Sequence, residues 1–168
     1  MHFCLDFRVN ERIIIDVINI KELILMRIQK FDHVSTLSNA GQAAQQNLDF
    51  ALTGKIRKPD NVRFDMGSDI PEYSISVKSA RFTLASASAF IAATFEGQLA
   101  EYVERVHSRE VAYVTKSDVA YIMTLPEFVT FCTLFCTMQK ESKKNGGGYK
   151  VRCKTESKKM LAWFEAHI

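Results

Sequence analysis

The sequence predicts one α/β domain, with α+β as a close variant, in which helices flank a central mixed β-sheet. Its 168 residues are enough to enclose a core. Hydrophobic residues make up 47% of the chain and charged residues 24%, which is typical of a globular protein. Segments with helical periodicity also alternate with short segments rich in β-branched residues. We therefore expect a single domain over 1–168, with 1–30 as an N-terminal extension.

A helix is the clearest element expected in the first half of the chain. It should span 39–53, because Ser38 or Asn39 can cap its start and Gly54 can end it. The preceding segment, 12–30, carries many β-branched residues and fits either a helix or a strand.

Short strands should follow this helix. Alternating hydrophobic and polar residues predict a strand over 62–66. The next segment, 68–82, reads SDIPEYSISVKSARF and predicts two pieces of strand around Pro71. In the second piece Tyr73, Ile75 and Val77 alternate with Ser74, Ser76 and Lys78. This alternation predicts a half-buried strand whose polar face carries Lys78.

Helices and strands also alternate in the second half. The expected elements are a long helix over 86–106, a hairpin over 110–124, a helix over 125–145, a strand over 149–154 and an amphipathic helix over 156–168. Pro126 fits the first turn of its helix. Phe128, Phe131 and Phe135 follow at helical spacing, which favours a face that packs in the core over a partner surface.

The cysteines indicate a reducing compartment. Cys4, Cys132, Cys136 and Cys153 lack the spacing of a disulfide framework. Cys132 and Cys136 lie in an apolar segment without a nearby histidine, so core packing explains them better than a shared metal. The aliphatic segment 11–26 is too short and too charged to span a membrane, and it lacks the features of a signal peptide. We therefore expect a cytoplasmic protein without membrane contact.

The segment that ends at Lys78 resembles the active-site signature of the PD-(D/E)xK nucleases, the restriction-endonuclease-like superfamily. In that pattern a helix precedes an aspartate, a strand ending in acid-x-Lys follows, and a second helix comes next. Asp69 and Ser76-Val77-Lys78 match the aspartate and the strand end, whereas the literal Pro59-Asp60 lies in an expected loop. The resemblance covers residues 38–115. It implies a restriction-endonuclease-like core and Mg²⁺- or Mn²⁺-dependent hydrolysis of DNA.

The chemistry of phosphodiester hydrolysis explains these residue types. A hard divalent cation requires oxygen ligands, which the carboxylate of Asp69 can supply. The ammonium of Lys78 can stabilise the charge that develops on the phosphate. Ser76 and Lys78 share one face of the strand, so we expect that face to be open and Ile75 and Val77 to lie against the core.

One departure from the pattern concerns the second acid, because Ser76 stands where the family has a carboxylate. Some members that resemble this variant take that acid from the following helix. Glu96, expected near the middle of that helix, is then the second metal ligand beside Asp69. Glu72 is the competing candidate, close in sequence but expected at a turn.

A basic segment supplies candidate contacts to nucleic acid. Residues 140–159 carry eight basic and two acidic side chains, a local charge of +6 compared with +3 for the chain. Such a segment suits contacts to the phosphate backbone, although a solvated surface loop explains it nearly as well. The candidate DNA contacts are Arg81, Lys143, Lys144, Lys150 and Arg152.

Two alternatives to an active nuclease remain. The first is a catalytically inactive nuclease fold that binds DNA or a protein, which the serine in place of the second acid favours. The second is a small interaction module of mobile-element origin. The resemblance further allows a homodimer on duplex DNA. No small-molecule cofactor is expected, since a nucleotide-binding glycine-rich loop is missing from the sequence.

Overall fold

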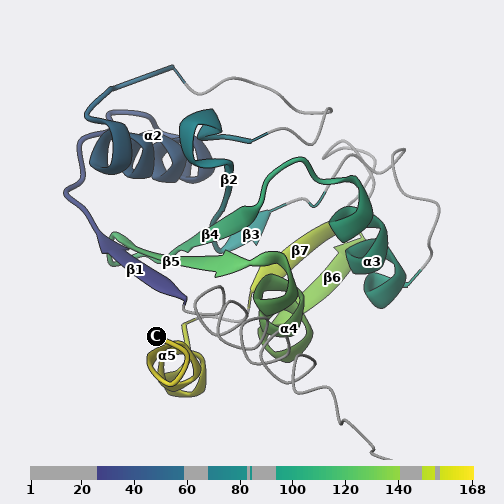
Figure 1. The fold of residues 1–168 in the computed structure, drawn as a ribbon. Coiled ribbons are helices and arrows are strands. Elements are labelled where there is room, and N and C mark those ends of the chain that lie inside the picture. Colours follow the sequence, from purple (N-terminus) through teal and green to yellow (C-terminus); the bar gives the residue numbers. More distant parts are fainter. Residues whose placement is uncertain (1–25, 59–67, 83, 85–93, 141–148, 154–155) are drawn as a thin grey trace, which may run out of the picture.

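The computed structural model describes residues 26–58, 68–82, 84, 94–140, 149–153 and 156–168. The elements in these segments are β1 (Arg27–Lys30), α2 (Ala40–Thr53), the 3-10 helix η1 (Pro71–Tyr73), β2 (Ile75–Lys78), β3 (Arg81–Phe82), α3 (Phe95–Arg105), β4 (Glu110–Val114), β5 (Val119–Thr124), α4 (Leu125–Phe135), β6 (Cys136–Lys140), β7 (Tyr149–Cys153) and α5 (Lys158–Glu165). This arrangement confirms the α/β class with a mixed sheet and flanking helices (Figure 1).

The strands form two sheets, so the prediction of a single sheet is wrong. The larger sheet has the order β1-β5-β4-β2, in which β2 is parallel to β4 and the other pairs are antiparallel. The smaller sheet has the order β3-β7-β6 and is antiparallel throughout. Among the described strands, β2 therefore lies at an edge of the larger sheet.

Helix α2 agrees closely with the helix predicted over 39–53. The side chain of Asn39 accepts hydrogen bonds from the backbone N–H groups of Gly41 and Gln42, which caps the first turn. Gly54 ends the helix in the left-handed conformation, with a φ of 71°, and its N–H donates to the carbonyl of Phe50. The predicted strand over 62–66 lies outside the described residues.

Two predicted helices have different boundaries in the structure. Helix α3 begins at Phe95, because Thr94 is extended and its side chain caps the first turn, so the helix does not run unbroken from residue 86. Helix α4 begins at a capping box between Thr124 and Glu127. It ends at Phe135, and strand β6 takes the place of residues 136–140 of the helix predicted over 125–145, while 141–145 lie outside the described residues.

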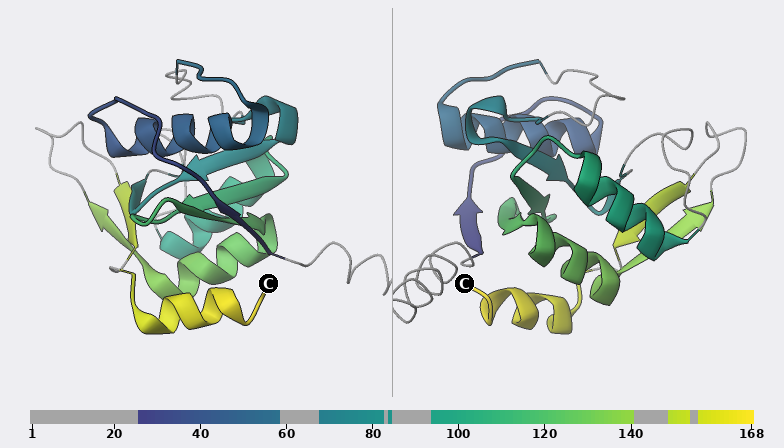
Figure 2. Two further views of the ribbon diagram at one scale, coloured as in Figure 1. Left: turned by 90° about the vertical axis from the view of Figure 1, so that its left-hand side faces the viewer. Right: turned by 45° about the vertical axis from the view of Figure 1, so that its right-hand side comes forward.

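The larger sheet separates two clusters of buried side chains. One face packs against α2 in a cluster that contains Ala44, Leu48, Ile75, Ala112, Val114, Ala120 and Ile122. The other face packs against α3, α4, α5 and the smaller sheet (Figures 1 and 2). Successive residues of β4 and β5 alternate between the two clusters, as the two-residue period of a strand requires.

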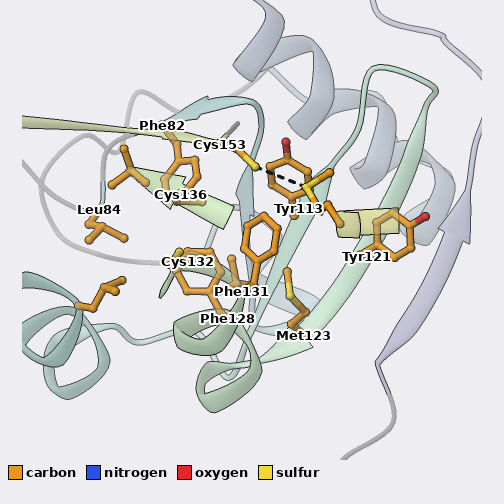
Figure 3. Packing of buried hydrophobic residues seen from close by; sticks show 14 of the residues in the cluster. Phe82, Leu84, Tyr113, Tyr121, Met123, Phe128, Phe131, Cys132, Cys136 and Cys153 are labelled. Atoms are coloured by element: carbon orange, nitrogen blue, oxygen red, sulfur yellow. Dashed lines mark hydrogen bonds between the residues drawn. The ribbon is translucent and has the colours of Figure 1, made fainter. Parts of the chain in front are cut away.

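Aromatic rings dominate the larger cluster (Figure 3). Phe164 of α5 stacks on Tyr121 of β5 with 3.7 Å between ring centroids, and it lies 5.4 Å from the ring of Phe131. Phe128 and Phe131 are fully buried and Phe135 packs against the same cluster, so the predicted role of these rings in the core is confirmed.

Three thiols also belong to this cluster, and they are unpaired as predicted. Cys136 in β6 is the direct cross-strand partner of Cys153 in β7. A hydrogen bond with Cys132 raises the pKa of Cys136, and one with Cys136 raises the pKa of Cys153. The thiols of Cys136 and Cys153 therefore stay protonated, and all three side chains pack in the cluster. Cys4 lies outside the described residues. Within the described segments, none of the helices is long and apolar enough to cross a membrane.

Replacement of Phe164 by alanine should destabilise the domain strongly. The side chain is 0% exposed and contacts rings from two other elements. Phe164→Ala should lower the free energy of unfolding by about 3–5 kcal/mol, measured by urea denaturation. The matched control is Phe50→Ala on the outer side of α2, which should cost less than about 1 kcal/mol. Equal losses in the two variants would contradict the described packing of α5.

Candidate active site

A tight turn places Asp69 beside the edge strand β2. Ile70 forms an isolated antiparallel bridge with Ile75, and the 3-10 helix Pro71–Tyr73 joins the two residues. Ser74 closes the turn in the left-handed conformation, with a φ of 56°. Tyr73 therefore lies in the turn. The prediction that it belongs to the strand with Ile75 is wrong, because β2 begins at Ile75.

The carboxylate of Asp69 is bound to β2 itself. Its Oδ2 atom accepts a 2.6 Å hydrogen bond from the backbone N–H of Val77 and a 3.2 Å hydrogen bond from the hydroxyl of Ser76. Among the described strands, β2 pairs with β4 on one side and with no strand on the other. Asp69 therefore accepts the hydrogen bond of a backbone N–H group, that of Val77, at the unpaired edge of β2. Asp69 is thus hydrogen-bonded to Val77, the residue that directly precedes Lys78 in β2.

The two faces of β2 have the predicted orientation. Ile75 and Val77 pack against the α2 cluster, so Ser76 and Lys78 point to the opposite side. The prediction that this side is open is wrong. Ser76 is only 3% exposed, and the ammonium of Lys78 lies 5.7 Å from the ring centroid of Tyr102 in α3. On this side of β2, Ser76 is therefore buried, and Lys78 is partly buried beside a ring of α3.

Glu96 has a different position from the one predicted. It lies in the first turn of α3 and is exposed, because the helix begins at Phe95. An acidic side chain there interacts favourably with the positive end of the helix dipole. This local role accounts for Glu96 without a metal ion.

Glu72 is held by an arginine. Both of its carboxylate oxygens accept hydrogen bonds from Arg57, at 2.8 and 2.9 Å, and the same guanidinium binds Asp49 of α2 at 2.5 and 2.8 Å. The hydrogen bond from Arg57 lowers the pKa of Glu72, and hydrogen bonds with Asp49 and Glu72 raise the pKa of Arg57. The three side chains tie η1 to the C-terminal part of α2.

The donor set around Asp69 limits how a metal ion can bind. In the part of the chain that the structure describes, no three or more His, Cys, Asp or Glu side chains gather where they could hold a metal. The described hydrogen bonds to the Asp69 carboxylate both use Oδ2, which leaves Oδ1 as an oxygen ligand. Mg²⁺ is commonly held by one or two carboxylates, substrate phosphates and water. The residues present therefore fit a cation that Asp69 shares with substrate, and they do not fit a closed protein site.

The predicted DNA contacts are only partly described. Lys143 and Lys144 lie outside the described residues, and Lys150 belongs to β7. Arg81 in β3 and Arg152 in β7 are direct neighbours in the smaller sheet, and the side chain of Arg152 is exposed.

Sequence reasoning did not identify a cleft at the other side of β2. The cleft has a volume of about 520 Å³ and is lined by His33, Asn39, Ala40, Gly41, Ala43, Ala44, Asn47, Ser79, Ala80, Val114, Thr115, Lys116 and Asp118. These residues come from four separate parts of the sequence and form no local motif. The only signal was the turn over Lys116–Asp118, which predicted the hairpin and not a site.

Comparison of the chain with protein-family models, with curated proteins and with solved structures finds no match in any of the three. The functional argument therefore depends on the geometry of the chain itself.

The ion pair of Glu72 should give the domain a pH-dependent stability. The pKa of Glu72 is lowered from its ordinary value of 4.5, so its contribution is present above that pH and is lost as the pH falls through the lowered pKa. Wild type should therefore be more stable than Glu72→Gln at pH 7, and the difference should shrink below pH 4.5. Urea denaturation across pH 3–7 measures this, and a difference that grows on acidification would contradict the ion pair.

A second acid at position 76 should test whether the site accepts a cation. Ser76→Glu would place a carboxylate beside that of Asp69, where the serine hydroxyl now donates a hydrogen bond. The like charges should lower the melting temperature in a chelator, and Mg²⁺ should restore part of the loss. Ser76→Ala is the control and should not respond to Mg²⁺. A Ser76→Glu protein that is equally stable with Mg²⁺ and with chelator would argue against a cation position at Asp69.

Proposed function

We propose that the chain is a restriction-endonuclease-like protein that hydrolyses phosphodiester bonds of DNA with the help of Mg²⁺ or Mn²⁺. The observation that carries the proposal is the 2.6 Å hydrogen bond from the Val77 N–H to Asp69, because it joins the aspartate to the strand that ends at Lys78. An acid held beside a strand that ends in a lysine supplies the two groups that this chemistry requires.

The order of elements supports the same proposal. Helix α2 precedes Asp69, β2 carries Ser76 and Lys78, and α3 follows. This is the order that the resemblance to the PD-(D/E)xK nucleases implies. Lys78 also has a defined environment, since its ammonium faces the ring of Tyr102.

Each residue has a distinct role in the proposed reaction. Asp69 would hold the cation through Oδ1, while its Oδ2 keeps the hydrogen bonds that fix its orientation. Ser76 would orient this carboxylate by donating to it. Lys78 would place its positive charge beside the phosphate at the end of β2. The cation, when bound, would polarise the phosphate and lower the pKa of a bound water.

A second candidate function is a nuclease fold that binds DNA without cleaving it. The specific observation in its favour is the hydrogen bond from Ser76 to Asp69. This bond satisfies the carboxylate in the absence of a metal, whereas two facing carboxylates would need a cation between them.

Cleavage of supercoiled plasmid DNA distinguishes the two candidates. Wild type should nick the plasmid with Mg²⁺ or Mn²⁺ and not with a chelator. Lys78→Ala should lower the rate by about a hundredfold or more, since its charge matters most in the transition state. Asp69→Asn should raise the Mg²⁺ concentration needed for half-maximal activity. Lys55→Ala, an exposed lysine beyond the end of α2, is the matched control and should keep wild-type activity.

The outcomes separate clearly. Equal residual nicking by wild type, Lys78→Ala and Asp69→Asn would identify a contaminant and reject the nuclease. A wild-type protein that cleaves with neither metal but binds duplex DNA, with affinity that falls as salt increases, would establish the second candidate.

A further inference from the structure

The cleft between α2 and the ends of two parallel strands has the position of a ligand site. Its lining residues Ser79 and Ala80 directly follow β2, and Val114 and Thr115 lie at the end of β4. Ligands of open α/β sheets bind outside the carboxyl ends of the strands. The volume of about 520 Å³ lies in the range of small-molecule sites. The cleft is on the α2 side, opposite to the face that carries Lys78.

His33 is the best-defined polar group of the cleft. Asn47 is 1% exposed, and its Oδ1 accepts hydrogen bonds from the backbone N–H groups of Val34 and Ser35, at 3.0 and 2.7 Å. Its Nδ2 must then face His33, and it lies 3.1 Å from Nδ1 of the imidazole. A neutral His33 therefore accepts at Nδ1 and carries its proton on Nε2. Asp118 lies 3.5 Å from the same Nδ1, so the far nitrogen is left for a ligand.

Further hydrogen-bond donors line the same cleft. The side-chain oxygen of Asn39 is used by the N–H groups of α2, so its amide NH₂ group remains to donate elsewhere. Lys116 supplies an exposed ammonium, and its backbone N–H donates to the carboxylate of Glu156 at 2.7 Å, which holds the turn in place. Ser79 adds a hydroxyl. Among the described residues, the one carboxylate that lines the cleft belongs to Asp118, and it faces His33.

Small apolar side chains form the remaining wall. They are Ala40, Ala43, Ala44, Ala80 and Val114. Gly41 lies close to Ser79, because a Cβ atom at Gly41 would be 3.9 Å from the hydroxyl oxygen of Ser79 and 3.4 Å from Oδ1 of Asn39. A wall of this kind can accept a flat ring, and the donors lie beside it.

We propose that this cleft binds a phosphomonoester attached to a planar ring, which is the chemistry of a nucleotide. The phosphate would accept hydrogen bonds from His33 Nε2, Ser79 and Lys116, and the ring would lie against the alanines of α2. The excess of donors over acceptors selects an anion. The described lining disfavours a cation, because Asp118 is the single carboxylate that it contains. The proposal goes beyond the nuclease function and does not depend on it.

Nuclear magnetic resonance titration of the full chain tests the site. Adenosine 5′-monophosphate should shift the backbone amide signals of residues 40–44, 79–80 and 115–118, and adenosine without phosphate should bind at least about tenfold more weakly. Inorganic phosphate should compete for the same site. A 5′-phosphorylated oligodeoxynucleotide, compared with its unphosphorylated form, shows whether the phosphate belongs to a free nucleotide or to the end of a strand. Either source supports the proposal.

Two variants locate the binding groups. Lys116→Ala and Ser79→Ala should each weaken binding of the phosphorylated probe by about tenfold or more, while Lys55→Ala should leave it unchanged. The amide spectrum of each variant away from the cleft reports whether it is folded. Three results with the wild-type protein would overturn the proposal. They are equal affinity for adenosine and its monophosphate, signal shifts centred on other residues, and no shifts with any probe at millimolar concentration. None of these results depends on the variants.

Discussion

The parallel pairing of β2 with β4 is the constraint on which the candidate sites depend. It places the ends of both strands at the same edge of the sheet, so that Ser79 and Thr115 line one cleft. It also leaves β2 at the edge of the described sheet, where Val77 donates to a side chain in place of another strand. The strand period of two then assigns successive residues to opposite faces, with Lys78 toward α3 and Ser79 toward α2.

The hydrogen bond between Ser76 and Asp69 determines how the candidate active site can work. An acid at position 76 would repel Asp69 unless a cation separated them, and a buried carboxylate pair would be costly to fold without one. The serine removes this cost and orients Asp69. In the proposed reaction the described side chains would contribute few charges to the cation, so substrate phosphate would contribute the others. In the proposed nuclease reaction, the affinity for metal and the affinity for DNA should therefore be linked.

Local patterns predicted the elements whose signals are local. Asn39 and Gly54 define α2 through capping, and the alternation in β4 and β5 defines a hairpin. The start of α3 was not placed in the same way, because apolar residues continue upstream of Thr94 in the sequence and hid the threonine that caps the helix. Glu96 was consequently placed in mid-helix instead of the first turn. Strand β6 was missed because its stability comes from pairing with β7, which is a contact distant in sequence.

The site residues also divide into those that a local sequence pattern relates and those that only tertiary packing brings together. Asp69, Ser76 and Lys78 are close in sequence, and a strand pattern was sufficient to relate them. The contact between Lys78 and Tyr102 depends on how α3 packs, which no spacing encodes. His33, Asn47 and Asp118 meet only because α2, β1 and the β4–β5 turn converge.

Helix α2 supports both sites, so neither is independent of the fold. Its Gln45 donates to the backbone carbonyl of Asp69 at 3.3 Å, and Arg57 links its Asp49 to Glu72 in the turn that follows Asp69. The first turns of the helix form one wall of the cleft. Ala44 and Leu48 of the same helix pack in the cluster that contains Ile75 of β2. A shift of α2 along the sheet would therefore move the aspartate and open or close the cleft at the same time. The hydrogen bonds from Arg57 to Glu72 oppose such a shift, because Arg57 is also bound to Asp49 of α2 and so joins the helix to the turn.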